Sequence, residues 1–131
     1  MSKPIIILIV DDDLEDQHIL EEYLHKQNEN IKFYCVLNGK EAINLLNGNE
    51  IPTPDLMVFD YKMPLMGAID VLKYLKENQI LNMTPKVVWS TSGQHSHQQI
   101  CIENGAVAYF VKPDSPGGLT ILAQKLINLI T

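Results

Sequence analysis

The chain has 131 residues, the size of one ordinary domain, with a formal net charge of −6 and a pI near 5.0. This acidic balance disfavours nonspecific nucleic-acid binding, which needs a basic face against the phosphates. Two cysteines, Cys35 and Cys101, are too few for a disulfide framework and are expected to be reduced thiols. The apolar run at residues 5–10 is too short for a signal peptide or a membrane span, so we expect one cytoplasmic domain, residues 1–131.

The chain opens with a strand-like run followed by a helix-like segment. Residues 5–10 are six apolar, mostly β-branched residues that stop at Asp11, which indicates a strand buried on both faces. Residues 14–27 then place apolar side chains near helical spacing, with acidic side chains on the opposite face. Asp13 stands where the N-cap of this helix is expected.

The same alternation continues through the middle of the chain. A more polar second strand is predicted at residues 31–37, and its composition favours an edge of the sheet. Residues 38–39 are Asn-Gly and predict a turn before a short helix at 41–46. A third buried strand at 56–59 stops at Asp60.

The second half of the chain adds two further strands and three helices. A helix is predicted at 68–77 and a strand at 86–89. A polar helix at 96–103, a strand at 107–111 and an apolar-striped helix at 118–130 complete the pattern. Strand and helix alternate five times, which is typical of an α/β fold with a parallel sheet and helices on both faces.

Four of the predicted strands end in a chemically distinctive residue. Asp11 and Asp12 follow the first strand, and Asp60 stands at the end of the third. Ser90 follows the fourth strand, and Lys112 follows the fifth. Because sites in open parallel sheets form outside the carboxyl ends of the strands, we expect these residues to converge in space.

The expected cluster has the composition of a phosphoryl-transfer site. Three carboxylates close together repel one another, and a hard divalent cation such as Mg²⁺ relieves the repulsion. Lys112 adds a mobile positive charge suited to a phosphate oxygen, and Ser90 offers a hydroxyl donor. A carboxylate nucleophile, Mg²⁺ and a lysine are the parts that phosphoryl transfer to an aspartate requires.

In their order along the chain, these segments resemble the receiver domains of bacterial two-component signalling. The resemblance spans essentially the whole chain and implies a flavodoxin-like, doubly wound sheet of five parallel strands in the order 2-1-3-4-5, with helices on both faces. The segments that carry it are Ile7 to Asp13, Asp60-Tyr61-Lys62-Met63-Pro64, Ser90-Thr91, Tyr109 and Lys112-Pro113.

The resemblance also implies roles for individual residues. Asp60 would be the phosphoacceptor, attacking a phosphohistidine on a sensor histidine kinase or a phosphotransfer protein. Asp12 would bind Mg²⁺ directly, and Asp11 mainly through water. Asp60 would be a further metal ligand, and Lys62 would contribute only its backbone carbonyl.

Three other positions would bind the phosphoryl group or report its presence. Ser90 and Lys112 would bind the phosphoryl oxygens, and the Lys112-Pro113 bond would be cis. Ser90 and Tyr109 would act as switch residues that alter the face made by residues 96–103, 107–111 and 118–130. Because no output domain follows Thr131, we expect the signal to pass through a bound protein, with neither nucleic acid nor membrane as a partner.

Some positions depart from the family's usual pattern. Met66-Gly67-Ala68 stands where Met-Asp-Gly is common, so the loop after Asp60 is expected to differ, with Gly67 supplying turn flexibility. Ser90 replaces the commoner threonine, and Thr91 is larger than the usual neighbour. Residues 95 and 97 are histidines with ligand-like spacing, but their polar surroundings favour solvated side chains.

Two other functions remain open from the residues alone. One is a haloacid-dehalogenase-type phosphatase, although its motif needs a second aspartate two residues after the nucleophile and Asp60 is followed by Lys62. The other is an adaptor of the same fold that works without phosphorylation. We do not expect an ordinary enzyme. We expect a signalling protein that catalyses only its own phosphorylation and dephosphorylation.

Overall fold

The computed structural model of the chain describes residues 3–130, in which strands and helices alternate from one end to the other. The elements are β1 (Ile5–Val10), α1 (Leu14–Gln27), β2 (Ile31–Val36), α2 (Gly39–Asn47), β3 (Leu56–Asp60), α3 (Ala68–Glu77), β4 (Lys86–Ser90), α4 (His95–Glu103), β5 (Ala108–Val111) and α5 (Pro116–Asn128).

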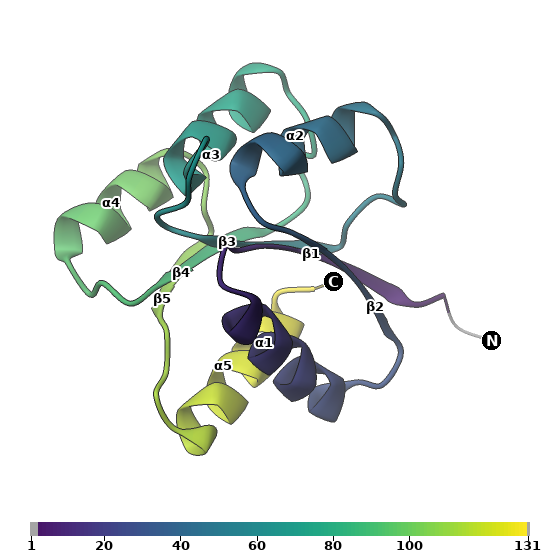
Figure 1. The fold of residues 1–131 in the computed structure, drawn as a ribbon, viewed down its shortest axis with the longest axis vertical. Coiled ribbons are helices and arrows are strands. Elements are labelled where there is room, and N and C mark those ends of the chain that lie inside the picture. The colour runs from purple at the N-terminus through teal and green to yellow at the C-terminus, as the bar shows by residue number, and fades with distance from the viewer. Residues whose placement is uncertain (1–2, 131) are drawn as a thin grey trace.

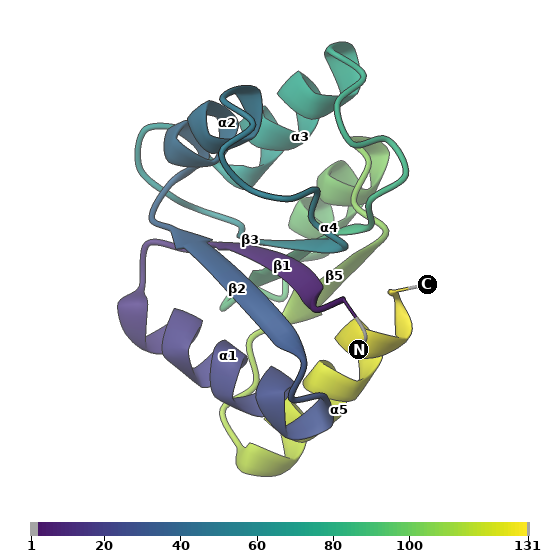
Figure 2. The same ribbon diagram turned by 90° about the vertical axis from the view of Figure 1, so that its right-hand side faces the viewer.

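The strands form one parallel sheet in the order β2-β1-β3-β4-β5. Helices α1 and α5 cover one face of this sheet, and α2, α3 and α4 cover the other (Figures 1 and 2). The flavodoxin-like fold class, the strand order and the edge position of β2 are thereby confirmed. Within residues 3–130, no helix has the length and apolar character that crossing a membrane demands.

Strand β1 shows how the sheet supports two cores. Leu8 and Val10 belong to the core beneath α2, α3 and α4, whereas Ile7 and Ile9 belong to the core beneath α1 and α5. All four side chains are fully buried. Burial on both faces explains why the run is apolar without alternation, and why the first polar side chain appears where the strand leaves the sheet.

Helix starts depend on local capping, and two of them lie two residues earlier than the sequence predicts. Asp13 caps α1 as expected, accepting hydrogen bonds from the N–H groups of the first turn. Helix α2 begins at Gly39 because the Asn38 side chain accepts from the Glu41 N–H, so this pair is a cap rather than a separate turn. Helix α5 begins two residues early, because Ser115 caps it and Pro116 is tolerated in a first turn.

Candidate functional site

The carboxyl ends of four strands meet at one edge of the sheet, and the chemically distinctive residues lie there. Asp11 and Asp12 follow β1, Asp60 ends β3, Ser90 ends β4, and Lys112 follows β5. A hollow of about 720 Å³ opens at this edge, with Asp12, Asp60, Ser90 and Lys112 among its lining residues. Residues separated by up to 101 positions are therefore brought to one place, as the rule for parallel sheets predicts.

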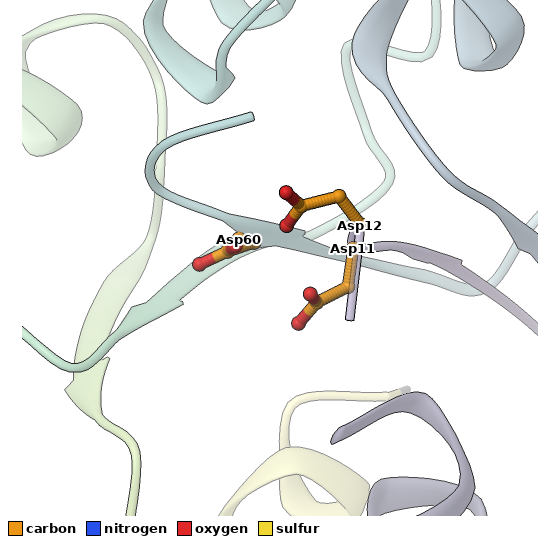
Figure 3. A group of neighbouring side chains, drawn as sticks. All are labelled: Asp11, Asp12 and Asp60. Atoms are coloured by element: carbon orange, nitrogen blue, oxygen red, sulfur yellow. The ribbon is translucent and has the colours of Figure 1, made fainter. Parts of the chain in front are cut away.

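Three carboxylates face one another at this hollow: Asp11, Asp12 and Asp60 (Figure 3). One oxygen from each lies within 4.8 Å of the other two. Asp11 is fully buried, and burial raises its pKa above the ordinary value. Burial and the charge of Asp11 raise the pKa of Asp60 to about 7, against the opposing effect of Lys112. Lys112 lowers the pKa of both carboxyl groups, but it does not offset the larger effect of burial.

The ammonium group of Lys112 is surrounded by carboxylates. Its Nζ lies 2.7 Å from Asp16 Oδ2, 3.0 Å from Asp11 Oδ2 and 3.4 Å from Asp60 Oδ1. Burial alone lowers the pKa of Lys112, but hydrogen bonds to Asp16 and Asp11 and the nearby negative charges raise it above its ordinary value. Lys112 is therefore a fixed positive charge at this edge of the sheet.

The peptide bond that follows this lysine differs from the expectation. The Lys112-Pro113 bond is trans, so the predicted cis bond is wrong. The lysine side chain nevertheless reaches the carboxylates, because three negative groups attract its ammonium.

Asp16 is a member of the cluster that the sequence analysis did not identify. It lies in the first turn of α1 and makes the shortest of the three ion pairs with Lys112. Its position three residues after the N-cap Asp13 was the available signal, because such a side chain lies at the start of the helix beside the strand ends. Nothing in the pattern indicated that it turns toward a lysine 96 positions away.

Ser90 and Tyr109 are joined through the loop that follows β4. Ser90 is buried, and its hydroxyl oxygen accepts a hydrogen bond from the Ser92 N–H at 3.1 Å. The Tyr109 hydroxyl donates to the Ser92 carbonyl oxygen at 2.6 Å, and its half-buried ring packs against the core beneath α2, α3 and α4. The two expected switch residues thus both bond to the backbone of Ser92.

His97 is not the solvated side chain that the sequence suggested. Its ring is stacked on Tyr61, with centroids 4.3 Å apart and an interplanar angle of 16°. Its Nδ1 also lies 3.0 Å from the Ser92 hydroxyl oxygen. The start of α4 is therefore tied to the residue next to Asp60, whereas His95 is exposed as expected.

The loop between β3 and α3 borders the hollow and has an unusual backbone. Lys62 is exposed and lines the hollow, as does Thr91 from the loop after β4. The expectation that Gly67 supplies the turn flexibility is wrong, because its φ of −80° is accessible to any residue. The left-handed residue of this loop is Leu65, with a φ of 66° and a side chain that is 79% exposed.

The fold and the composition of this edge define a class, and comparison with known proteins identifies it. The chain matches the response regulator receiver domain over residues 7–124. It therefore belongs to the family of response regulator receiver domains, which are signalling domains rather than classical enzymes. Members of this family interact with histidine kinases or phosphotransfer proteins, and they bind Mg²⁺ or Mn²⁺ at an aspartate cluster.

Relatives and solved structures agree with this family. Two-component response regulator ORR5 of Oryza sativa subsp. japonica is 30% identical over 122 residues, which cover 93% of this chain and 88% of ORR5. ORR7 of the same plant is 28% identical over 122 residues, but this chain spans only 56% of its length. The Mn²⁺-bound form of response regulator Rcp1 has a TM-score of 0.77 and 25% identity over 93% of this chain and 91% of that chain. The phosphorylated cyanobacterial phytochrome response regulator RcpA shares the fold, with a TM-score of 0.87 at 22% identity over 98% and 97% of the two chains.

Proposed function

We propose that this chain is a receiver that accepts a phosphoryl group on Asp60 from a phosphohistidine and signals through protein–protein contacts. The donor is a sensor histidine kinase or a phosphotransfer protein. The observation that carries the proposal is the setting of Asp60. Its carboxylate clusters with Asp11 and Asp12, lies 3.4 Å from the Lys112 ammonium and borders an open hollow. The family match over residues 7–124 supports treating residues 1–131 as one receiver domain.

The aspartate cluster fits a hard divalent cation, and the proposal assigns Mg²⁺ to it. Carboxylate oxygens in an incomplete protein cage are the ligands that Mg²⁺ prefers. Asp11 already hydrogen-bonds to Lys112, so we assign the direct contact to exposed Asp12 and a water-mediated one to Asp11. Asp60 and the Lys62 backbone carbonyl complete the proposed protein ligands. When bound, the cation neutralises charge on the transferring phosphoryl oxygens.

Asp60 supplies the nucleophile in the proposed reaction. One of its carboxylate oxygens attacks the phosphorus of the phosphohistidine, so that a P–O bond forms while the P–N bond breaks and the imidazole leaves. The Lys112 ammonium lies close enough to Asp60 to move from its carboxylate to the oxygens of the attached phosphoryl group. The Ser90 hydroxyl accepts from Ser92, which leaves its own proton for a phosphoryl oxygen. The chain thus catalyses only its own phosphorylation and, when water attacks the acyl phosphate, its own dephosphorylation.

The proposed signal leaves the site through Ser90 and Tyr109. Movement of Ser90 toward the phosphoryl group pulls on Ser92, whose carbonyl oxygen holds the Tyr109 hydroxyl. The face made by α4, β5 and α5 then changes, and we propose that a downstream protein binds there. We also propose a cytoplasmic location, with neither nucleic acid nor membrane as a partner. The net charge of −6 supports the first exclusion, because nucleic-acid binding needs a basic face against the phosphates.

The test is phosphorylation with a small-molecule donor. The wild-type chain is incubated with acetyl phosphate and Mg²⁺, and intact mass is measured. We expect one labile phosphoryl adduct that is lost in Asp60→Asn and retained in Asp70→Asn, a control that makes the same change at an exposed position on α3. An unmodified wild-type chain contradicts the proposal and favours the adaptor that works without phosphorylation.

A further inference from the structure

Asp16 stands in a position where a helix-capping role is expected, but its carboxylate is used elsewhere. It is the third residue of α1, where an acidic side chain commonly bonds back to the N–H of the capping residue. That N–H, on Asp13, already donates to Asp11 Oδ1 at 2.9 Å. The Asp16 carboxylate is therefore free of the capping bond, and its Oδ2 lies 2.7 Å from Lys112 Nζ.

Lys112 is consequently shared unequally among its acidic neighbours. Its hydrogen bonds to Asp16 at 2.7 Å and Asp11 at 3.0 Å are shorter than its 3.4 Å contact with Asp60. The lysine side chain is only 10% exposed and the Asp16 side chain 30% exposed, so this pair is less screened by water than a surface ion pair. An ammonium has three N–H donors, and two of them already point to acids other than the phosphoacceptor.

Given the proposed function, the neighbours of Lys112 change when Asp60 is phosphorylated. The acyl phosphate presents oxygens of higher charge than the carboxylate that it replaces, beside a lysine that Asp16 also attracts. We propose that Asp16 is a positioning residue that competes with the phosphoryl group on Asp60 for Lys112. It favours the unphosphorylated state, because full engagement of the phosphoryl group requires the short Asp16–Lys112 ion pair to weaken.

This role also links the site to the start of α1. The Asp16–Lys112 pair joins the first turn of α1 to the end of β5, and these two segments are otherwise separated along the chain by 96 positions. Transfer of the lysine to the phosphoryl group releases that connection. Phosphorylation then changes the contacts of α1 as well as the face made by α4, β5 and α5.

A purely structural explanation predicts different behaviour. A carboxylate in the first turn stabilises a helix through the helix dipole, whatever occupies the hollow. If that were the only role of Asp16, removing its charge would loosen α1 and weaken every ligand of the site. Competition for Lys112 instead predicts opposite effects on two ligands. Binding of a phosphoryl mimic strengthens, whereas binding of Mg²⁺ alone weakens, because the site loses a negative charge and Lys112 moves toward the remaining acids.

The test measures two affinities by the fluorescence of Trp89, the chain's single tryptophan, or by calorimetry. They are the affinity for Mg²⁺ alone and the affinity for beryllofluoride, a phosphoryl mimic, at saturating Mg²⁺. In Asp16→Asn we expect beryllofluoride to bind roughly fivefold more tightly, the order of one partly exposed charged hydrogen bond, and Mg²⁺ alone to bind more weakly. Asp16→Glu keeps the charge and is expected to restore wild-type affinities.

The matched control is Glu15→Gln, which removes the same charge one residue earlier. Glu15 is exposed, and the ion pairs of Lys112 within residues 3–130 are with Asp11, Asp16 and Asp60. Equal beryllofluoride affinities for Asp16→Asn and Glu15→Gln, or weaker binding in Asp16→Asn, overturn the inference while the wild type still binds. A wild type that binds no beryllofluoride instead overturns the proposed function, and the inference with it.

Discussion

The ammonium of Lys112 lies 4.7 Å from the centroid of the Trp89 ring, over a tryptophan that is 2% exposed. Because a cation over an indole perturbs its electronic environment, a change in the position of Lys112 should change Trp89 emission. We expect Mg²⁺ to produce a saturable change in emission intensity as it draws the neighbouring carboxylates away from Lys112. Titration of the wild type and of Asp12→Asn checks this, since the variant lacks the proposed direct ligand. An equal response in both chains would contradict the assignment of Asp12.

Asp60 makes the stability of the metal-free chain depend on pH. The pKa of Asp60 is raised from its ordinary value of 3.8 to about 7, so the folded chain binds a proton more tightly than the unfolded chain between these values. This contribution to stability is present in mildly acidic solution and is lost as the pH rises through about 7. With EDTA, we expect the free energy of unfolding to fall between about pH 5.5 and about pH 8, and to fall less in Asp60→Asn. Urea unfolding of both chains at both pH values measures the difference.

The same pKa gives Mg²⁺ binding a pH dependence of the opposite sign. A proton on Asp60 competes with the cation, so Mg²⁺ should raise the melting temperature more at about pH 8 than at about pH 5.5. Melting curves at fixed free Mg²⁺ check this. An equal stabilisation by Mg²⁺ at both pH values would show that the titration of Asp60 is not linked to the cation.

The fold and the positions of the central acids were predictable, because they depend on the order of strands and helices and not on how individual side chains pack. The continuous apolar run of Ile5–Val10 requires a strand covered on both faces, and this is its environment in the sheet. The meeting of Asp12, Asp60 and Lys112 follows from the rule that the carboxyl ends of parallel strands share an edge. It required no knowledge of side-chain conformations.

The contacts of Asp16 and His97 depended on such details and were missed. Asp16 could accept a hydrogen bond from the Asp13 N–H at the start of its own helix, but that N–H already donates to Asp11. The Asp16 side chain turns to Lys112 instead. The stacking of His97 depends on where the loop after β3 brings Tyr61, and that loop contains a left-handed leucine that no pattern indicated. Long-range partners chosen by loop geometry are therefore the part of the site that sequence spacing does not determine.

The Tyr109 hydroxyl provides a test of the link between β5 and the loop after Ser90. In Tyr109→Phe the Ser92 carbonyl loses its donor, and we expect a loss of about 1 kcal/mol in the free energy of unfolding. If this bond also restrains Ser90 in the unphosphorylated state, beryllofluoride should bind somewhat more tightly to the variant. Tyr23→Phe is the control, because Tyr23 lies on α1 in the opposite layer. Equal urea unfolding of the two variants would contradict a stabilising role for the Tyr109 hydroxyl.

Gly39 determines how closely α2 approaches the loop that follows Asp60. A Cβ added to Gly39 would clash with the Met66 carbonyl oxygen and with Val71 Cγ2, and the Gly39 N–H donates to that same carbonyl at 3.0 Å. Gly39→Ala therefore forces α2 and this loop apart, and we expect it to cost about 2 kcal/mol or more in the free energy of unfolding. Gly117→Ala is the control, because a Cβ at this helical position meets nothing within 4 Å and the alanine restricts the unfolded chain. Urea unfolding should show Gly39→Ala destabilised and Gly117→Ala unchanged or more stable.

Because the displaced loop carries Lys62, Gly39→Ala should also weaken Mg²⁺ binding. A loss of stability with unchanged Mg²⁺ affinity would show that the position of the loop relative to α2 does not determine the geometry of the site.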